Sequence, residues 1–196
     1  MKLLHVLSIA TATIMLIGCA GAPTTETAEM KPMANENPMV GGAAMFSSKN
    51  IIENAVNSKD HTTLVAAVKA AGLVETLQGP GPFTVFAPVN SAFDALPTGA
   101  VANLLKPENK AALTKVLTCH VVGANAMSFA IKGMIADDAG VHPVTTLGGC
   151  VLLARYRDGK ILLTDENGRT AMVTIADVKQ SNGVIHVIDT VLLPKQ

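Results

Sequence analysis

The sequence contains no tryptophan, and aromatic residues make up only 3% of its 196 positions. Stacking platforms for single-stranded nucleic acid or for sugars are built from such rings, so the chain has few of them. Neither sign of charge is in excess, because 15 lysine and arginine residues balance 15 acidic ones. Proteins that bind nucleic acid or an anionic membrane surface usually carry a basic excess. We therefore expect no nucleic-acid partner.

The sequence signatures of common catalytic sites are missing as well. The chain has no Gly-x-Ser-x-Gly, Cys-x-x-Cys, His-Glu-x-x-His or Walker sequence, the spacings typical of hydrolases, redox proteins, metalloproteases and nucleotide-binding enzymes. A metal site would require the fold to gather histidines that are scattered along the chain: His61, His120, His142 and His186. The sequence predicts a protein that is not an enzyme and has no cofactor. A catalytic triad assembled only by folding stays open.

The one long apolar run lies at the start of the chain. Lys2 precedes an uncharged stretch over residues 3–17, which is typical of a removable secretion signal and too short for a permanent transmembrane helix. It leads into a Leu-Ile-Gly-Cys sequence that ends at Cys19 and resembles the lipobox of bacterial lipoproteins. We expect residues 1–18 to be a signal peptide and Cys19 to carry the lipid that anchors the protein in a membrane. Ala20 follows the cysteine, and a residue other than Asp at this position resembles the pattern of lipoproteins that are sent to the outer membrane. The expected location is therefore periplasmic or on the cell surface, with an anchor in the outer membrane.

Residues 19–45 are rich in Thr, Glu, Pro, Asn and Met and show no apolar periodicity. This composition is typical of a flexible tether, so we expect the folded domain to span residues 46–196. Four of the nine methionines fall in or beside the tether: Met30, Met33, Met39 and Met45. Thioether sulfur is a suitable ligand for Cu(I), so a copper-handling protein is an alternative. The spacing is irregular, and no His or Cys joins these methionines.

The folded part begins with signals for two helices. Asn50, followed by Glu53 three residues later, predicts a capping box at the start of the first helix. Asp60 predicts the start of the second helix, whose apolar residues recur at helical spacing. Gly72 follows them and is suited to end this helix in a left-handed conformation.

Two stretches are the most specific in the chain. The first, residues 81–93, reads Gly-Pro-Phe-Thr-Val-Phe-Ala-Pro-Val-Asn-Ser-Ala-Phe and predicts a buried strand, a turn at proline and a short helix capped by Asn90. The second, residues 181–194, contains an Asn-Gly turn and a strand in which apolar residues alternate with His186. We expect Asn90 and His186 to have structural roles, holding a turn and a strand.

These two stretches resemble the paired signature motifs of the fasciclin (FAS1) domain family, and the resemblance runs from about Phe46 to Pro194. Helical segments come first and antiparallel strands later, which predicts an α+β fold. The resemblance implies a single domain, a wedge-shaped β-sandwich with a layer of short helices. Strands are expected in the second half of the domain at residues 144–147, 151–157, 161–164 and 171–178.

Fasciclin-like domains are modules of cell surfaces and matrices, often adhesive and without a common catalytic activity. The resemblance therefore implies a non-enzymatic binding module whose partner is a surface protein or a glycan. In animal members, residues around a Tyr-His pair have been linked to integrin recognition, and these members also carry an Asp-Ile pair shortly before the second motif. The corresponding positions here make His120, Asp177 and Val178 candidate binding residues, with Cys119 in place of the tyrosine. The residues alone favour an outward aspartate at a strand end.

Cys119 and Cys150 are the thiols that remain after lipidation of the third cysteine. Two cysteines in an oxidising compartment can pair. Both, however, fall on predicted strands that face a core, where free buried cysteine is comparably common, so both alternatives stay open. A carrier of a small apolar ligand is a further functional alternative, and it would require an internal pocket.

Overall fold

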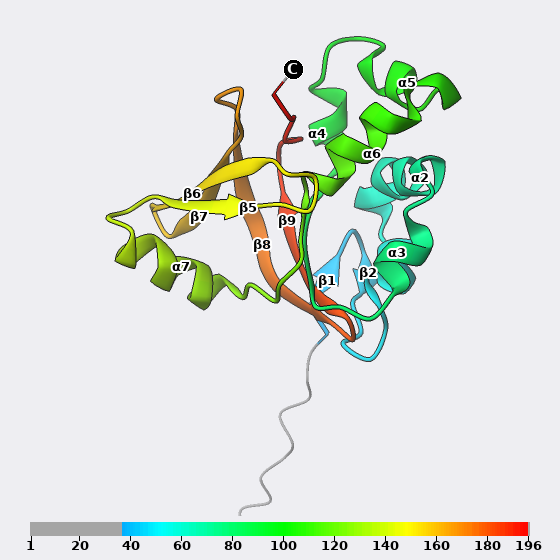
Figure 1. Ribbon diagram of the computed structural model, residues 1–196. Helices are drawn as coiled ribbons and strands as arrows, with labels where there is room; N and C mark the ends of the chain where they lie inside the picture. Colours follow the sequence, from blue (N-terminus) through cyan, green and yellow to red (C-terminus); the bar gives the residue numbers. More distant parts are fainter. Residues whose placement is uncertain (1–36, 196) are drawn as a thin grey trace, which may run out of the picture. The chain divides into compact units, whose positions relative to one another are not determined.

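A computed structural model describes residues 37–195 of the chain (Figure 1). The predicted signal peptide, the lipidated Cys19 and the tether up to residue 36, with Met30 and Met33, lie outside the described residues. The helical segments are α1 (Ile51–Ala55), η1 (Lys59–His61), α2 (Thr62–Ala71), α3 (Val74–Gln78), α4 (Asn90–Asp94), α5 (Ala100–Leu104), η2 (Pro107–Asn109), α6 (Lys110–Thr118) and α7 (Ser128–Asp137). The strands are β1 (Met39–Val40), β2 (Ala43–Ala44), β3 (Phe83–Pro88), β4 (Val121–Val122), β5 (His142–Thr145), β6 (Val151–Arg157), β7 (Lys160–Thr164), β8 (Thr170–Gln180) and β9 (Gly183–Ile188).

Strands β3 to β9 form one sheet in the order β4-β3-β9-β8-β7-β6-β5. The β3–β9 pair is parallel and the other neighbours are antiparallel. Strand β8 pairs with β7 through its first residues and with β9 through the rest, and two register shifts interrupt its pairing with β9. Such bulges bend a strand. Strand β8 therefore belongs to two arms of the sheet, one with β9, β3 and β4 and the other with β7, β6 and β5. Helices α2, α4, α5 and α6 lie on one side of β9, and α7 lies on the other (Figure 1). The predicted α+β class is confirmed.

The two central strands are buried on both faces. Val85 and Ala87 of β3 join an apolar cluster with α1, α2 and α6, whereas Phe86 between them joins a second cluster with α7, β6 and β7. Strand β9 alternates in the same way, with Val187 in the first cluster and Ile188 in the second. A strand covered on both sides has no solvent face to mark with polar residues, which explains why the two motif strands are almost continuously apolar.

The folded part begins earlier than the predicted boundary at residue 46. Strands β1 and β2 form a hairpin within the segment assigned to the tether. Val40 and Met45 are 3% and 2% exposed and belong to the cluster around α1 and α2. The hairpin docks through Gly41, whose carbonyl accepts a hydrogen bond from the Lys59 N–H. The tether assignment for residues 39–45 is therefore wrong, because these isolated apolar side chains are buried without any sequence periodicity.

The helix signals are partly confirmed. Asn50 and Glu53 form the predicted capping box at the start of α1, and Gly72 ends α2 with a left-handed φ of 75°. Asp60, however, lies within η1 and makes no side-chain cap. The start of α2 is capped instead by Asn90, from a distant part of the chain. The Asn90 Oδ1 accepts hydrogen bonds from the Thr63 N–H at 3.0 Å and from the Thr62 hydroxyl at 3.2 Å.

The predicted cap of α4 by Asn90 is therefore wrong. Asn90 is the first residue of α4, the position before it is Val89, and no side chain caps this helix. The Asn90 Nδ2 also donates to the Lys59 carbonyl at 2.8 Å. The first motif thus ties the end of β3 to the beginning of α2, which fixes one helical layer to the central strands.

Candidate functional site

The second motif carries a buried histidine at the bulge of β8. His186 is fully buried on β9, and its ring stacks on Phe86 with centroids 5.7 Å apart. The His186 Nε2 donates to the Ala126 carbonyl at 2.8 Å, and Nδ1 accepts from the Asp177 N–H at 3.3 Å. Burial lowers the pKa of His186, opposed by the hydrogen bond to Ala126 and the charge of Asp177. The ring is therefore a neutral structural link between β9, β8 and the segment before α7.

Asp177 occupies the bulge itself, with a left-handed φ of 61°. Its carboxylate accepts hydrogen bonds from the Ser128 N–H at 2.7 Å and from the Ser128 hydroxyl. Because Ser128 is the first residue of α7, the carboxylate compensates for the unpaired N–H groups and positive dipole at that helix end. Asp177 is thus half-buried and oriented inward, toward α7.

Folding brings Ser128, Asp177 and His186 together, the residue types of a hydrolase triad. In such a triad the histidine accepts the serine proton and the aspartate holds the other ring nitrogen. Here the Ser128 hydroxyl donates directly to Asp177, and the His186 Nε2 is occupied by a backbone carbonyl. No ring nitrogen is left to activate the hydroxyl. This cluster therefore holds α7 in place and lacks the serine–histidine hydrogen bond of a catalytic triad.

His120 follows Cys119, the residue that ends α6, and is 2% exposed. Its Nδ1 donates to the Val116 carbonyl at 2.8 Å, and its Nε2 accepts from the Leu192 N–H at 3.0 Å. Burial lowers the pKa of His120 to about 4, opposed by the Val116 hydrogen bond and the charge of Asp165. The histidine is therefore a neutral link between α6 and the C-terminal segment.

The candidate binding residues taken from the family resemblance do not form a surface. Val178 is fully buried and His120 is nearly so, and both ring nitrogens of His120 are occupied. Only Asp177 keeps partial exposure, and its carboxylate is engaged by Ser128. In this structure neither His120 nor Val178 is accessible to a partner, because His120 is enclosed between α6 and the C-terminal segment and Val178 lies on the inward face of β8, in the apolar cluster.

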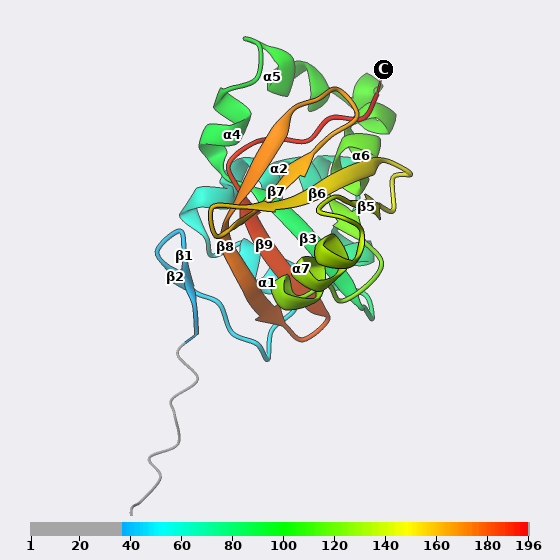
Figure 2. The same cartoon turned by 90° about the vertical axis from the view of Figure 1, so that its left-hand side faces the viewer.

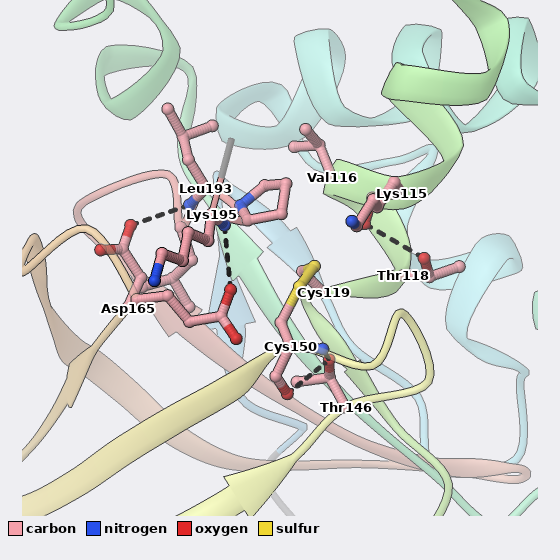
Figure 3. The surroundings of a disulfide bond; sticks show 12 residues. Lys115, Val116, Thr118, Cys119, Thr146, Cys150, Asp165, Leu193 and Lys195 are labelled. Atoms are coloured by element: carbon pink, nitrogen blue, oxygen red, sulfur yellow. Dashed lines mark hydrogen bonds between the residues drawn. A yellow bond between two sulfur atoms is a disulfide. The ribbon is translucent and has the colours of Figure 1, made fainter.

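Cys119 and Cys150 are joined in a disulfide, with their Cα atoms 5.4 Å apart (Figure 3). Cys119 ends α6 and Cys150 directly precedes β6, so neither lies on a strand as predicted. The loop that carries Cys150 is also held by backbone hydrogen bonds, from Gly148 to Thr118 and from Leu147 to Val121. The covalent bond therefore reinforces a contact that already joins the two arms of the sheet. Disulfides are typical of proteins outside the cytoplasm.

The alternatives of a copper protein and a small-ligand carrier gain no support. Met45 is buried in the core and Met39 is exposed, and within residues 37–195 no three His, Cys, Asp or Glu side chains gather as metal ligands. An apolar cavity between α1, α2, α3 and β3 has a volume of only about 40 Å³. Ligand pockets usually exceed ~300 Å³.

A larger, mixed polar and apolar pocket of about 210 Å³ lies between α7, the β6–β7 turn and β8. We call it the α7 pocket; it is lined by Ser128, Lys132, Gly159, Lys160, Ile161, Val173, Thr174 and Ala176. The Lys132 Nζ lies 4.7 Å from the centre of the Tyr156 ring, which is 45% exposed. In Figure 2, α7 lies toward the viewer, below strands β6 and β7. The sequence analysis missed this site, although the single tyrosine between two arginines beside an Asp-Gly turn was a visible signal.

Comparison with known proteins completes this picture. The family model described as the fasciclin domain matches residues 59–194. The chain belongs to the fasciclin family. A solved structure of a FAS1 domain pair from the insect cell adhesion molecule Fasciclin I shares the fold, with a TM-score of 0.53 and 22% identity over 66% of this chain and 43% of that one. The fasciclin domain is a non-catalytic module, so the expectation that the protein is not an enzyme is supported by its family.

Relatives of this fasciclin domain include bacterial and animal proteins. "Protein sll1483" of Synechocystis is 45% identical over 89% of both chains. "Cell surface glycolipoprotein MPB83" of Mycobacterium bovis is 30% identical over 88% of this chain and 79% of its own length. "Transforming growth factor-beta-induced protein ig-h3" of Sus scrofa is 37% identical over 67% of this chain and 17% of its own.

None of the helices described in residues 37–195 is long and apolar enough to span a membrane.

Proposed function

We propose that this protein is a lipid-anchored binding module of the bacterial envelope or cell surface, which attaches to a surface protein or glycan and performs no chemistry. The observation that carries the proposal is the 30% identity to a cell-surface glycolipoprotein over 88% of the chain. The lipobox at Cys19 and the Cys119–Cys150 disulfide support it from independent parts of the sequence. In this proposal residues 1–18 are removed and residues 19–36 connect the lipid to the domain. Ala20 favours the outer membrane as the anchoring site.

The proposed anchor is tested by cell fractionation. The protein with intact Cys19 is expected in the membrane fraction, where several acyl chains on one residue hold it far more firmly than a single chain would. The Cys19→Ser variant is expected in the soluble extracytoplasmic fraction. Equal amounts of both proteins in the soluble fraction would contradict lipid anchoring.

The proposed binding function is tested with the detergent-purified lipoprotein. It is immobilised and exposed to envelope and surface extracts of its own host, and the retained protein and glycan are identified. Saturable retention of one defined surface component is expected. Retention equal to that on a resin carrying a heat-denatured sample would contradict the proposal.

Asp177 has a defined place in this proposal. Because its carboxylate holds the first residue of α7, it orients the helix that borders the α7 pocket. We therefore assign Asp177 a positioning role, rather than the direct contact implied by the family resemblance.

A further inference from the structure

The α7 pocket holds positive charge without an acidic protein partner. Lys132 comes from α7 and Lys160 from the beginning of β7, and both line the pocket. Within residues 37–195 neither ammonium group forms a salt bridge. Two acidic residues adjoin lining residues in the sequence. The Asp177 carboxylate is engaged by the N–H and hydroxyl of Ser128, and Asp158, which precedes Gly159, forms no salt bridge within the described residues. Two cationic donors therefore remain available to an anionic ligand.

Two of the three exposed aromatic rings of the domain lie on the elements that border the same pocket, α7 and β6; the third is Phe46. The chain has five phenylalanines and one tyrosine, and the two most exposed of these rings are Phe129 at 73% and Tyr156 at 45%. Tyr156 pairs with the lining residue Ile161 across the β6–β7 hairpin, and Lys132 lies over its ring. Phe129 precedes Lys132 by three positions, so the two are neighbours on the surface of α7.

A ring beside two ammonium groups is suited to a sugar that carries an anionic group. The aromatic face packs against the apolar C–H face of the sugar, as amphipathic rings do at other interfaces, and the lysines pair with its carboxylate or sulfate. The volume of about 210 Å³ is below that of most ligand pockets and suits one sugar unit of a longer chain. The neighbouring units would remain on the open surface that includes Phe129.

We propose that the α7 pocket binds the acidic sugars of a surface polysaccharide. Lys132 and Lys160 bind the anionic group, and Tyr156 packs against the ring. This inference rests on the proposed function, because a surface polysaccharide is met only outside the cytoplasm. A nucleic-acid ligand is disfavoured, because the sequence as a whole has no basic excess, with 15 lysine and arginine residues against 15 acidic ones.

The proposal is tested by calorimetric titration of the detergent-purified lipoprotein with oligogalacturonate, which is carboxylated, chondroitin sulfate, which is sulfated, and dextran, which is neutral. Saturable binding of at least one acidic probe is expected, weakening as NaCl is raised, with no binding of dextran. The double variant Lys132→Met, Lys160→Met keeps the apolar stems and should lower the affinity about tenfold, equivalent to ~1.4 kcal/mol. The Tyr156→Ala variant should also weaken binding, and Tyr156→Phe should retain it because the ring is kept.

The matched control is the double variant Lys106→Met, Lys110→Met, which removes the same charge near α5 and α6, away from α7 (Figure 1). Its affinity should stay within about twofold of the original. Equal weakening in both double variants would overturn the pocket assignment, because the attraction would then be general. Absence of binding to both acidic probes would overturn the ligand class. Binding of anionic phospholipid vesicles with the same dependence on Lys132 and Lys160 would also overturn it, in favour of a lipid headgroup.

These outcomes are separable from failure of the proposed function. If host surface material is retained equally by the original protein and the Lys132→Met, Lys160→Met variant, the binding function stands and the pocket assignment is wrong. If no host material is retained but an acidic probe binds at the pocket, the pocket assignment stands and the proposed cellular function is wrong.

Discussion

Two buried histidines, His120 and His186, illustrate how a residue suited to chemistry can serve structure alone. His120 and His186 are both buried, and each ring donates one hydrogen bond and accepts another within the domain. A neutral imidazole satisfies both contacts, whereas a protonated ring would place a second donor against a backbone N–H. Protonation and the folded state therefore compete.

This competition predicts a loss of stability in mild acid. Because the pKa of His120 is about 4 when folded and near 6.5 in an unfolded chain, the unfolded state binds more protons between these values. Stability is thus retained above the unfolded pKa and falls as the pH drops toward the folded one. His120 alone should reduce the free energy of unfolding by about 2 kcal/mol between pH 7 and pH 5. Urea denaturation at the two pH values measures it.

The control is a direct measurement of the protonation state of the His120 ring. Nitrogen-15 chemical shifts of His120 should show a neutral ring protonated at Nδ1 at both pH values. A protonated His120 ring in the folded protein at pH 5 would contradict the prediction.

Asn90 makes a second prediction at this scale. Replacing Asn90 by Ala removes the acceptor for the Thr63 N–H at the start of α2 and should cost about 1 kcal/mol, the usual value of a helix cap. Asn90→Asp keeps the acceptor for the Thr63 N–H but loses the Nδ2 donor to the Lys59 carbonyl, so it should recover only part of this loss. Amide hydrogen exchange separates the two helices: the Thr63 amide should exchange faster in Asn90→Ala, and the α4 amide of Phe93 should not. Faster exchange confined to Phe93 would restore the sequence-based interpretation.

Asn90 also shows where sequence reasoning reaches its limit. The local pattern correctly indicates an asparagine beside a helix start, but the helix that it caps begins 28 residues earlier in the chain. The predicted strand 151–157 has the same bounds as β6, because alternation is a local signal. The acceptor of a polar side chain is set by tertiary packing, so such partners and the burial of Val178 could not be read from spacing.

At the scale of elements, the start of the β3–β9 pair depends on glycine. A Cβ added to Gly183 would lie 2.0 Å from the Phe83 carbonyl oxygen, and one added to Gly81 would lie 1.9 Å from that of Asn182. These contacts are with backbone, which cannot rotate away. This close approach explains why both motifs carry glycine where their strands begin.

Gly183→Ala should therefore destabilise the protein by about 3 kcal/mol or more, through displacement of a central strand pair. The matched control is Gly133→Ala in α7, where a Cβ would meet no atom within 4 Å. Alanine in a helix is preferred to glycine, so this change should stabilise by up to about 1 kcal/mol. Guanidinium unfolding of both variants measures the difference. Similar changes in the free energy of unfolding for both variants would show that the close approach of β3 and β9 does not require glycine at position 183.

The disulfide joins two elements that are separated by 31 positions in the chain. Closing a loop of this size restricts the unfolded chain, which in the chain-entropy model contributes about 3 to 4 kcal/mol. The variant Cys119→Ala, Cys150→Ala should lose stability of this order, and the melting temperature of the unchanged protein should fall on reduction. In the Cys19→Ser background, thiol titration under denaturing conditions should find no free thiol before reduction. Two free thiols before reduction would contradict the pairing.

At the scale of the whole molecule, the domain begins before the predicted boundary at residue 46. Sequence composition alone indicates a tether up to residue 45, because Val40 and Met45 are isolated among polar residues and small residues. In the structure both are buried against α1 and α2, and Gly41 approaches the Ser58–Asp60 segment so closely that a Cβ would lie 2.3 Å from the Ser58 Oγ. The hairpin is therefore part of the domain, which includes residues 39–45.

A chain that starts at Phe46 should consequently be less stable than one that starts at Asn37. Removing the Val40 and Met45 side chains uncovers the apolar cluster they fill, and each buried side chain of this size contributes about 1.5 to 3 kcal/mol. The expected loss is therefore about 3 kcal/mol or more, measured by guanidinium unfolding of both chains. Val40→Ala and Met45→Ala in the longer chain separate side-chain burial from chain length, and together they should reproduce most of the loss. If the two chains unfold at the same guanidinium concentration, the hairpin adds nothing to the core. The predicted tether boundary at residue 45 would then describe the molecule better than the observed packing does.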